Sequence, residues 1–323
     1  MSEEQTMLAE MADGLFGELA AAPDDAGAWQ RLEEVGLADL LVAEDAGGFG
    51  GSWDDARVVF RLAGYHGLAE PLVEAALARH IGSRNGYEGY GALAGGAAGT
   101  LDADSFTGHL HSISGPRGAS YVVAPFEGRT IIVDLAAAQI SQGTAISGET
   151  RANAHVEGAR ALQTGDDVLA LAAFARSAQI AGALDAALSR SVEYVNERKQ
   201  FGRPLAKFQA VQQSLATFAC EAAAANCAAI GAAQALDRGN ASFEIAAAKL
   251  RANMAAGTGA SIAHQVHGAI GFTEEYPLHK LTRRLWTWRS EMGGDAHWSQ
   301  LLGARVLERG ADNFWPDMTA LTD

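Results

Sequence analysis

Hydrophobic side chains recur at every third or fourth position near the start of the chain, as at Leu8, Met11 and Leu15. That spacing places them on one face of an α-helix. The glycine-rich stretch 47–55, GGFGGSWDD, then forces a loop. It has no GxGxxG spacing and no following Gly-Lys-Ser/Thr, so we favour a turn between helices over a phosphate-binding loop. The pattern predicts an N-terminal helical domain over residues 1–82.

The hydrophobic pattern changes between residues 83 and 163. The segments SYVVAPF (120–126) and RTIIVDLA (129–136) are short, rich in β-branched side chains and bounded by turn-forming or polar residues, which is typical of β-strands. GHLHSIS (108–114) alternates with period two. At typical strand and loop lengths, roughly eighty residues hold about six to eight strands. We expect a small middle β-domain over residues 83–163.

Helical spacing returns after residue 164. Turn-forming residues at 201–204, at 237–240 and around Pro277 divide the segment 164–323 into four long helices. Helices of that length joined by short turns favour a bundle. The predicted fold class is therefore α+β, with an N-terminal helical domain, a small middle β-domain and a C-terminal four-helix bundle over 164–323.

Composition and charge limit the kinds of molecule that the protein is expected to bind. Hydrophobic residues make up 48% and charged residues 20% of the 323 residues, which is the balance of an ordinary globular protein. The 39 acidic and 24 basic residues give a net charge of −15, which argues against binding to nucleic acid or to an anionic membrane. An anionic ligand would need a local basic pocket. The chain has no basic leader and no long apolar run, so we expect a cytoplasmic location.

Cys220 and Cys227 lie seven residues apart in an alanine-rich segment that is predicted to be helical. This spacing puts them about two turns apart on one face of the helix. We interpret both thiols as core positions rather than as a disulfide.

Two motifs in the last segment carry specific information. One is ERKQFGRPL (197–205), followed by Phe208 and Gln209, and the other is QVHGAIGFTEEYP (265–277). Together they resemble the ERxxFGxPLxxFQ and QxxGGxGxxxEYP signatures of the acyl-CoA dehydrogenase family. Residues 29–63 are similar to the N-terminal helical domain of that family. The resemblance implies a flavoenzyme that removes hydrogens from Cα and Cβ of an acyl-CoA thioester, a glutamate taking the α-proton and FAD accepting hydride.

In that family the two motifs bind the adenine diphosphate half of an FAD whose isoalloxazine ring lies mainly on a neighbouring subunit. The resemblance implies cofactor-binding roles for Arg198, Gln200, Phe201, Gln209, Gln265, His267 and Gly268. The planar, permanently charged fork of Arg198 suits a diphosphate, although a basic residue also stabilises a helix C-terminus. His264 and His267 have no evident third ligand nearby, so we expect no metal site.

The proton-abstracting glutamate of the family has two usual positions, and the resemblance implies that both are empty here. Most members carry it shortly after the EYP motif, where the matching residue is Met292. Others carry it in the first helix of the C-terminal domain, where the matching residue is Ala172. Neither side chain can accept a proton near neutral pH. Glu291, displaced by one residue, is the remaining candidate for the base, and Asp295 is a further alternative.

Residues 90–120 do not match the family's flavin-ring segment, and Gly294 and Ala296 stand where Thr and Gln normally touch flavin. The chain thus resembles the non-catalytic subunit of heteromeric acyl-CoA dehydrogenases of steroid side-chain degradation, which contain two copies each of two different subunits. This implies an FAD site shared with a second, catalytic subunit that also holds most of the acyl-CoA. Two alternatives remain open: a self-sufficient dehydrogenase that uses Glu291, and a helical scaffold that binds no flavin.

Overall fold

The N-terminal part of the chain is helical. The computed structural model describes residues 2–22, 26–115 and 117–320. The predicted loop at 47–52 precedes α3, where Ser52 and Asp55 form a capping box by bonding each other's main-chain N–H. The helices and 3-10 turns of this part are α1 (Glu3–Ala21), α2 (Ala28–Val35), η1 (Leu37–Asp39), η2 (Glu44–Ala46), α3 (Trp53–His66) and α4 (Leu72–Arg84).

A seven-stranded sheet follows, so the expectation of six to eight strands is confirmed. The order along the sheet is β1-β4-β5-β7-β3-β2, with β6 paired to β7. All of these pairs are antiparallel except that of β1 with β4. The strands are β1 (Gly91–Leu93), β2 (Gly96–Asp102), β3 (Ser105–Ile113), β4 (Tyr121–Phe126), β5 (Arg129–Asp134), β6 (Gln139–Thr144) and β7 (Thr150–Thr164).

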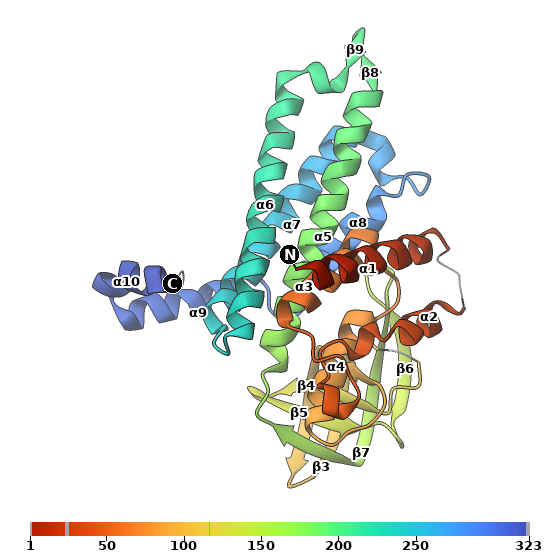
Figure 1. The fold of residues 1–323 in the computed structure, drawn as a ribbon, viewed down its shortest axis with the longest axis vertical. Helices are drawn as coiled ribbons and strands as arrows, with labels where there is room; N and C mark the ends of the chain where they lie inside the picture. Colours follow the sequence, from red (N-terminus) through yellow and green to blue (C-terminus); the bar gives the residue numbers. More distant parts are fainter. Residues whose placement is uncertain (1, 23–25, 116, 321–323) are drawn as a thin grey trace.

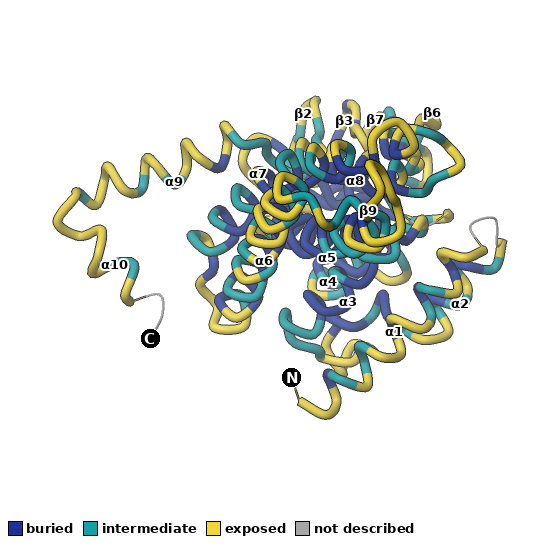
Figure 2. Tube along the Cα trace, turned by 90° about the horizontal axis from the view of Figure 1, so that it is seen from above, coloured by how far each residue is buried: buried dark blue, intermediate teal, exposed yellow. Residues whose placement is uncertain are grey.

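The C-terminal part is a helical bundle with a small hairpin at one end (Figure 1). The bundle elements are α5 (Val168–Glu197), β8 (Lys199–Gln200), β9 (Arg203–Pro204), η3 (Leu205–Lys207), α6 (Gln209–Asp237), α7 (Ser242–His267), η4 (Gly268–Phe272) and α8 (Leu278–Ser290). After them, α9 (Asp295–Arg309), η5 (Ala311–Asn313) and α10 (Phe314–Ala320) extend away from the body, and most of their surface is exposed (Figure 2). The α+β class and its helix, sheet, helix order are as predicted.

Helix α5 forms the centre of the molecule. It packs against α3 on one side and against α6, α7 and α8 on the other. Glycine permits the close approach to α3: a Cβ at Gly64 would overlap the main chain of Gln179, and one at Gly182 would overlap that of Arg61. One hydrophobic cluster joins residues of α1, α3 and α4 to residues of α5, α6 and α7. The N-terminal helices therefore share their core with the bundle.

Helices α5 and α6 have the same mean hydropathy of 1.3 over their most apolar 18 residues, but their surroundings differ. Both are long and apolar enough to cross a membrane by length and composition alone. That segment of α5 is 83% buried in the protein, whereas that of α6 is 28% buried. Cys220 and Cys227 lie on the uncovered face of α6, so their interpretation as core residues was wrong. Because Glu221 and Asp237 are the only charged residues of α6, periodicity could not show which face packs inward.

Both cysteines are expected to react in the isolated native chain. Exposed thiols are modified at rates set by their thiolate fraction, without prior unfolding. Titration with a chromogenic disulfide reagent in buffer should modify both thiols, and Cys220→Ser should remove one of them. Reaction that begins only after denaturant is added would contradict the exposed position of these residues.

Candidate functional site

The first sequence motif forms a tight turn at the outer end of the bundle (Figure 1). Arg198 ends α5, and its main-chain N–H donates to Tyr194 O at 2.8 Å. Phe201 and Gly202 connect β8 to β9 with φ of +52° and +80°, the conformation of a two-residue hairpin turn of the primed type. The Phe201 ring is 91% exposed. The motif thus presents its side chains to the outside.

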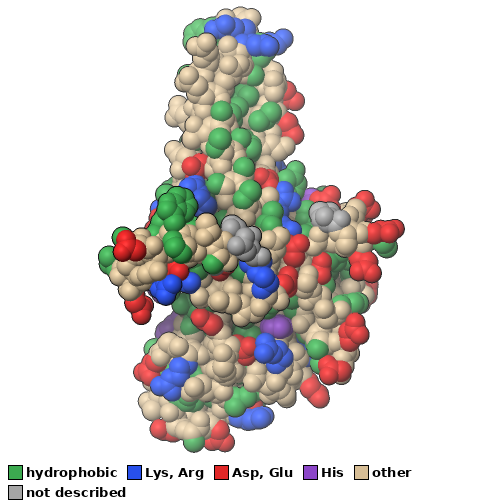
Figure 3. All heavy atoms as spheres, turned by 60° about the vertical axis from the view of Figure 1, so that its left-hand side comes forward, with side chains coloured by type: hydrophobic (Ala, Val, Ile, Leu, Met, Phe, Trp, Pro, Cys, Tyr) green, Lys and Arg blue, Asp and Glu red, His purple; other side chains and the backbone are tan. Residues whose placement is uncertain are grey.

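Positive charge gathers at this end of a chain whose net charge is −15. Arg198, Lys199, Arg203 and Lys207 lie within ten residues and are all exposed, and Figure 3 shows basic side chains at the top of the bundle. The Arg203 guanidinium lies 4.2 Å from the centroid of the Phe208 ring. Within the described residues, the Arg198 guanidinium makes no ion pair or hydrogen bond. We call residues 198–209 the basic tip.

The second motif reaches the same end of the bundle. Helix α7 ends at His267, and Gly268 has a φ of +64°. The Tyr194 ring, one turn before Arg198, stacks on the His267 ring with 4.5 Å between centroids. The structure therefore brings together the two motifs that the sequence assigned to one ligand. Most of the predicted cofactor residues are exposed, namely Arg198, Gln200, Phe201, Gln209, Gln265 and Gly268.

His267 differs from the other predicted cofactor residues because it is 3% exposed. Its Nδ1–H donates to Ala263 O at 2.7 Å, and its Nε2 lies 3.1 Å from the Tyr276 hydroxyl. Burial and the charge of Arg190 lower the pKa of His267, despite the opposing effect of the Ala263 hydrogen bond. The imidazole is therefore neutral near pH 7, and both of its nitrogens already have partners within the chain.

His264 and His267 each contact other side chains of the chain. His264 Nε2 lies 2.9 Å from Thr282 Oγ1, and the His264 ring stacks on Phe272. Across residues 2–22, 26–115 and 117–320, no group of three or more His, Cys, Asp or Glu side chains is placed to hold a metal ion.

The loop between α8 and α9 holds the expected base position and borders a cavity of about 230 Å³. Residues of the sheet, of α4, of α5 and of this loop line the cavity. Its lining consists of Glu74, Leu93, Gly95, Ser112, Ser114, Arg151, Leu169, Arg176, Ser290, Glu291, Met292 and Gly293.

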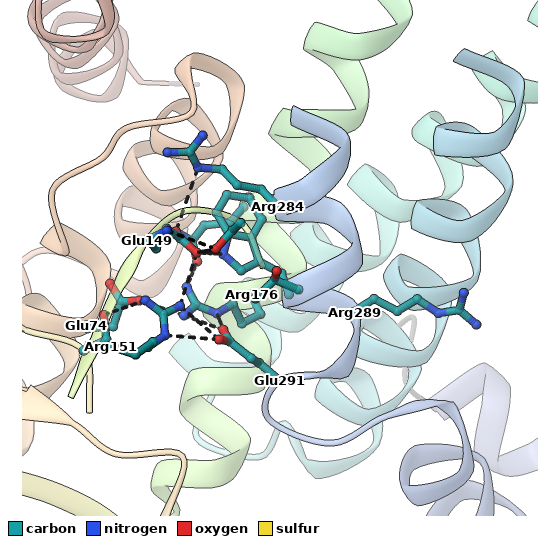
Figure 4. A network of polar contacts seen from close by, with 12 residues as sticks. Glu74, Glu149, Arg151, Arg176, Arg284, Arg289 and Glu291 are labelled. Carbon is teal, nitrogen blue, oxygen red and sulfur yellow. Dashed lines mark hydrogen bonds and ion pairs between the residues drawn. The ribbon is translucent and has the colours of Figure 1, made fainter. Parts of the chain in front are cut away.

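Glu291 points toward two arginines from other elements (Figure 4). Its Oε1 accepts from Arg151 Nη2 at 2.9 Å, and its Oε2 accepts from Arg176 Nε at 2.9 Å. Arg176 Nη2 lies 2.8 Å from the same Oε2. Both oxygens of the carboxylate are therefore engaged by permanently charged guanidinium groups.

A larger charge cluster surrounds this pair (Figure 4). Arg176 Nη2 donates to Glu74 Oε1 at 2.7 Å, and Arg151 Nη2 donates to Glu149 Oε2 at 3.2 Å. Burial would raise the pKa of Glu74, but Arg176 and Arg151 hold it below its ordinary value. Burial would lower the pKa of Arg176, but Glu291 and Glu74 raise it. The sequence did not reveal this cluster, because its members come from α4, β7, α5 and two separate loops and share no motif.

A buried lysine fixes the same loop. Lys249 Nζ donates to Trp288 O at 3.1 Å, to Gly293 O at 3.2 Å and to the Asn253 side chain at 2.6 Å. Burial lowers the pKa of Lys249 to about 7. The loop is further held where Trp298 Nε1 donates to Met292 O at 3.1 Å. The conformation around Glu291 is thus set by contacts from several helices.

Ala172 and Met292, the residues that the resemblance matched to the two base positions, differ in how far they are buried. Ala172 is buried within α5, in the hydrophobic cluster that joins the N-terminal helices to the bundle. Met292 is partly buried and packs against that cluster. Gly294 precedes α9, and Ala296 is exposed in its first turn. Neither expected base position carries an ionisable group.

N-terminal helices, a mostly antiparallel middle sheet and a C-terminal helical bundle together form the acyl-CoA dehydrogenase fold. Residues 136–306 match the family description "Acyl-CoA dehydrogenase, C-terminal domain". The chain is 30% identical over 308 residues to "Acyl-CoA dehydrogenase IpdE2" of Mycobacterium tuberculosis, an alignment that covers 87% of this chain and 91% of that protein. The chain therefore belongs to the acyl-CoA dehydrogenase family, a family of flavin-dependent oxidoreductases.

Solved structures give the same fold. A chain of the ChsE4-ChsE5 complex from Mycobacterium tuberculosis is similar with a TM-score of 0.84 and 19% identity, covering 96% of this chain and 99% of that chain. A chain of the Tcur3481-Tcur3483 steroid ACAD has a TM-score of 0.82 and 24% identity, covering 95% of this chain and 98% of that chain. At these identities the likeness concerns the fold.

Proposed function

We propose that this chain is the non-catalytic subunit of a heteromeric, FAD-dependent acyl-CoA dehydrogenase. The observation that carries the proposal is the hydrogen bonding of the Glu291 carboxylate. Its Oε1 accepts from Arg151 and its Oε2 accepts from Arg176. A general base must present a free carboxylate oxygen to the proton that it removes. Since Met292 and Ala172 cannot accept a proton and Asp295 Oδ2 already accepts a hydrogen bond from Arg289, we propose that the base for α,β-dehydrogenation comes from another subunit.

The donor set of the basic tip and of residues 265–268 fits the diphosphate half of FAD. The Arg198 guanidinium is unpaired within the described residues, and a Cβ at Gly202 or Gly268 would meet no atom within 4 Å, so the main chain there is open to a ligand. Arg198 would bind the diphosphate in its bidentate geometry. When bound, FAD supplies the hydride acceptor for the reaction. The residues proposed to border its adenine diphosphate half are Gln200, Phe201, Gln209, Gln265 and the main chain at Gly268.

The exposed apolar surface of the chain supports the proposal that a partner subunit covers it. Between positions 216 and 227 the exposed side chains of α6 are small and uncharged, being alanine, threonine or cysteine. Hydrophobic side chains are also exposed on the α9–α10 arm, among them Leu307 and Trp315, and Figure 3 shows hydrophobic side chains on this face of the molecule. Apolar surface of this kind is typically covered in an assembly. The relatives ChsE4-ChsE5 and Tcur3481-Tcur3483 are themselves described as pairs.

We propose that the partner is a catalytic acyl-CoA dehydrogenase subunit that carries the base, the flavin-ring contacts and most of the acyl-CoA. Two copies of each subunit would form a cytoplasmic heterotetramer. Because one similar structure is described as a steroid ACAD, the CoA thioester of a steroid side chain is the proposed substrate class.

Purification of the tagged chain from its native host tests this function. We expect a second acyl-CoA dehydrogenase chain and FAD to co-purify with it, and the complex to oxidise an acyl-CoA. Arg198→Ala should keep the partner but weaken FAD binding by about 10- to 100-fold, since hydrogen bonds to charged groups contribute about 1.5–3 kcal/mol. Arg129→Ala, which alters an exposed arginine of β5, is the matched control and should retain FAD.

The other outcomes correspond to the two alternatives. A colourless complex with its partner present would indicate a scaffold that binds no flavin. A purified chain that binds FAD and turns over acyl-CoA without a partner would indicate a self-sufficient dehydrogenase. Either result would overturn the proposed function.

A further inference from the structure

Three aromatic rings connect the two motifs at the end of the bundle. Tyr194 comes from α5, His267 is the last residue of α7, and Tyr276 precedes α8. The His267 ring lies 4.5 Å from that of Tyr194 and 4.9 Å from that of Tyr276, between ring centroids. We infer that His267 is a positioning residue that holds Arg198 in register with the 265–268 segment, and not a ligand of the cofactor. This inference rests on the proposed FAD site.

The path from His267 to Arg198 is short. Tyr194 O accepts the main-chain N–H of Arg198 at 2.8 Å, so the stacked ring belongs to the helical turn that positions the main chain of Arg198. Beyond Val195, the last residues of α5 are exposed and have little packing of their own. Contacts to a rigid ligand require atoms placed within about 0.5 Å. The stack of Tyr194 on His267, together with the edge contact of Tyr194 with Tyr276 at 6.0 Å between ring centroids, therefore holds one motif against the other.

The hydrogen bonds of His267 define its orientation. The carbonyl of Ala263 can only accept, so Nδ1 carries the hydrogen and Nε2 is the acceptor for the Tyr276 hydroxyl. Burial raises the pKa of Tyr276, which therefore remains a donor. The imidazole is clamped in one tautomer between the α7 main chain and the EYP segment. A side chain with both nitrogens so used has no group left for a ligand.

Titration of the deflavinated complex with FAD, followed by flavin fluorescence, measures the effect. His267→Ala removes the stack and both hydrogen bonds, and we expect it to weaken FAD binding by about tenfold. Tyr276→Phe retains the ring but removes one hydrogen bond, and we expect a smaller loss of about two- to fivefold. Thermal unfolding of each complex verifies that the variants remain assembled.

A double-mutant cycle separates positioning from general destabilisation. If His267 acts through Arg198, the double variant His267→Ala/Arg198→Ala should bind FAD within about twofold of Arg198→Ala alone. Should His267→Ala fail to assemble, the cycle is run with Tyr276→Phe, for which the same lack of additivity is expected.

Each failure has its own signature. If Arg198→Ala left the FAD affinity unchanged, the proposal that the basic tip binds FAD would itself be wrong. Weakened binding in Arg198→Ala with full additivity in the cycle, or with unchanged affinity in both His267→Ala and Tyr276→Phe, would leave the cofactor site intact and overturn the positioning role.

Discussion

Replacing Arg176 with methionine is expected to lower the free energy of unfolding by about 3–5 kcal/mol, the usual cost of removing one member of a buried ion pair. Arg176 is 3% exposed and binds both Glu74 and Glu291. Methionine has a similar length but no charge, so the two carboxylates would lose their shared guanidinium and Glu74 would stay buried. Urea unfolding of the chain, monitored by circular dichroism, measures the loss.

A matched control is available in Arg84, whose exposed side chain pairs with Asp166 at 3.2 Å. Arg84→Met is expected to change the free energy of unfolding by less than about 1 kcal/mol, because the Arg84 side chain is 59% exposed and Asp166 keeps its hydrogen bonds to Thr164 and Asn85. Equal effects of the two substitutions would contradict a structural role for the charge cluster.

Local chemistry in the sequence predicted much of the fold. Ser52 and Asp55 fall directly after the glycine-rich loop and cap α3, and the break at 201–204 becomes the hairpin of the basic tip. Both features depend on residues close together in the chain, which propensity and capping rules describe well. The same local signal placed Arg198 and Gln265 at helix ends, and the structure joins these two ends through the stack of Tyr194 on His267.

Long-range contacts were beyond the reach of these patterns. Arg176 is the one charged residue between Val168 and Leu184 of α5, and its partners Glu74 and Glu291 lie 102 and 115 residues away. Nothing in the spacing of a single arginine indicates which carboxylates it meets. His267 lies within a motif of cofactor residues, yet it is buried because Tyr194 and Tyr276 cover it. Packing between distant segments decides such cases.

Glu291→Gln distinguishes a structural carboxylate from a catalytic one. In the co-purified complex, we expect turnover per bound flavin to stay within about twofold of wild type, because the base is supplied by the partner. If Glu291 were the base, its loss would reduce turnover by a factor of about 100 to 10,000. Initial rates with a saturating acyl-CoA, normalised to flavin absorbance, measure the difference.

The same substitution is expected to reduce stability. The amide nitrogen of glutamine would face a guanidinium donor on one side, so Arg151 or Arg176 would lose an acceptor in a buried place, at a cost of about 1–3 kcal/mol. Met292→Leu, a similar-sized change at the next residue, keeps the ion pairs and is the matched control. Lower stability with retained turnover in Glu291→Gln identifies the carboxylate as a structural partner of two arginines, whereas lost turnover with unchanged stability would assign the base to this chain.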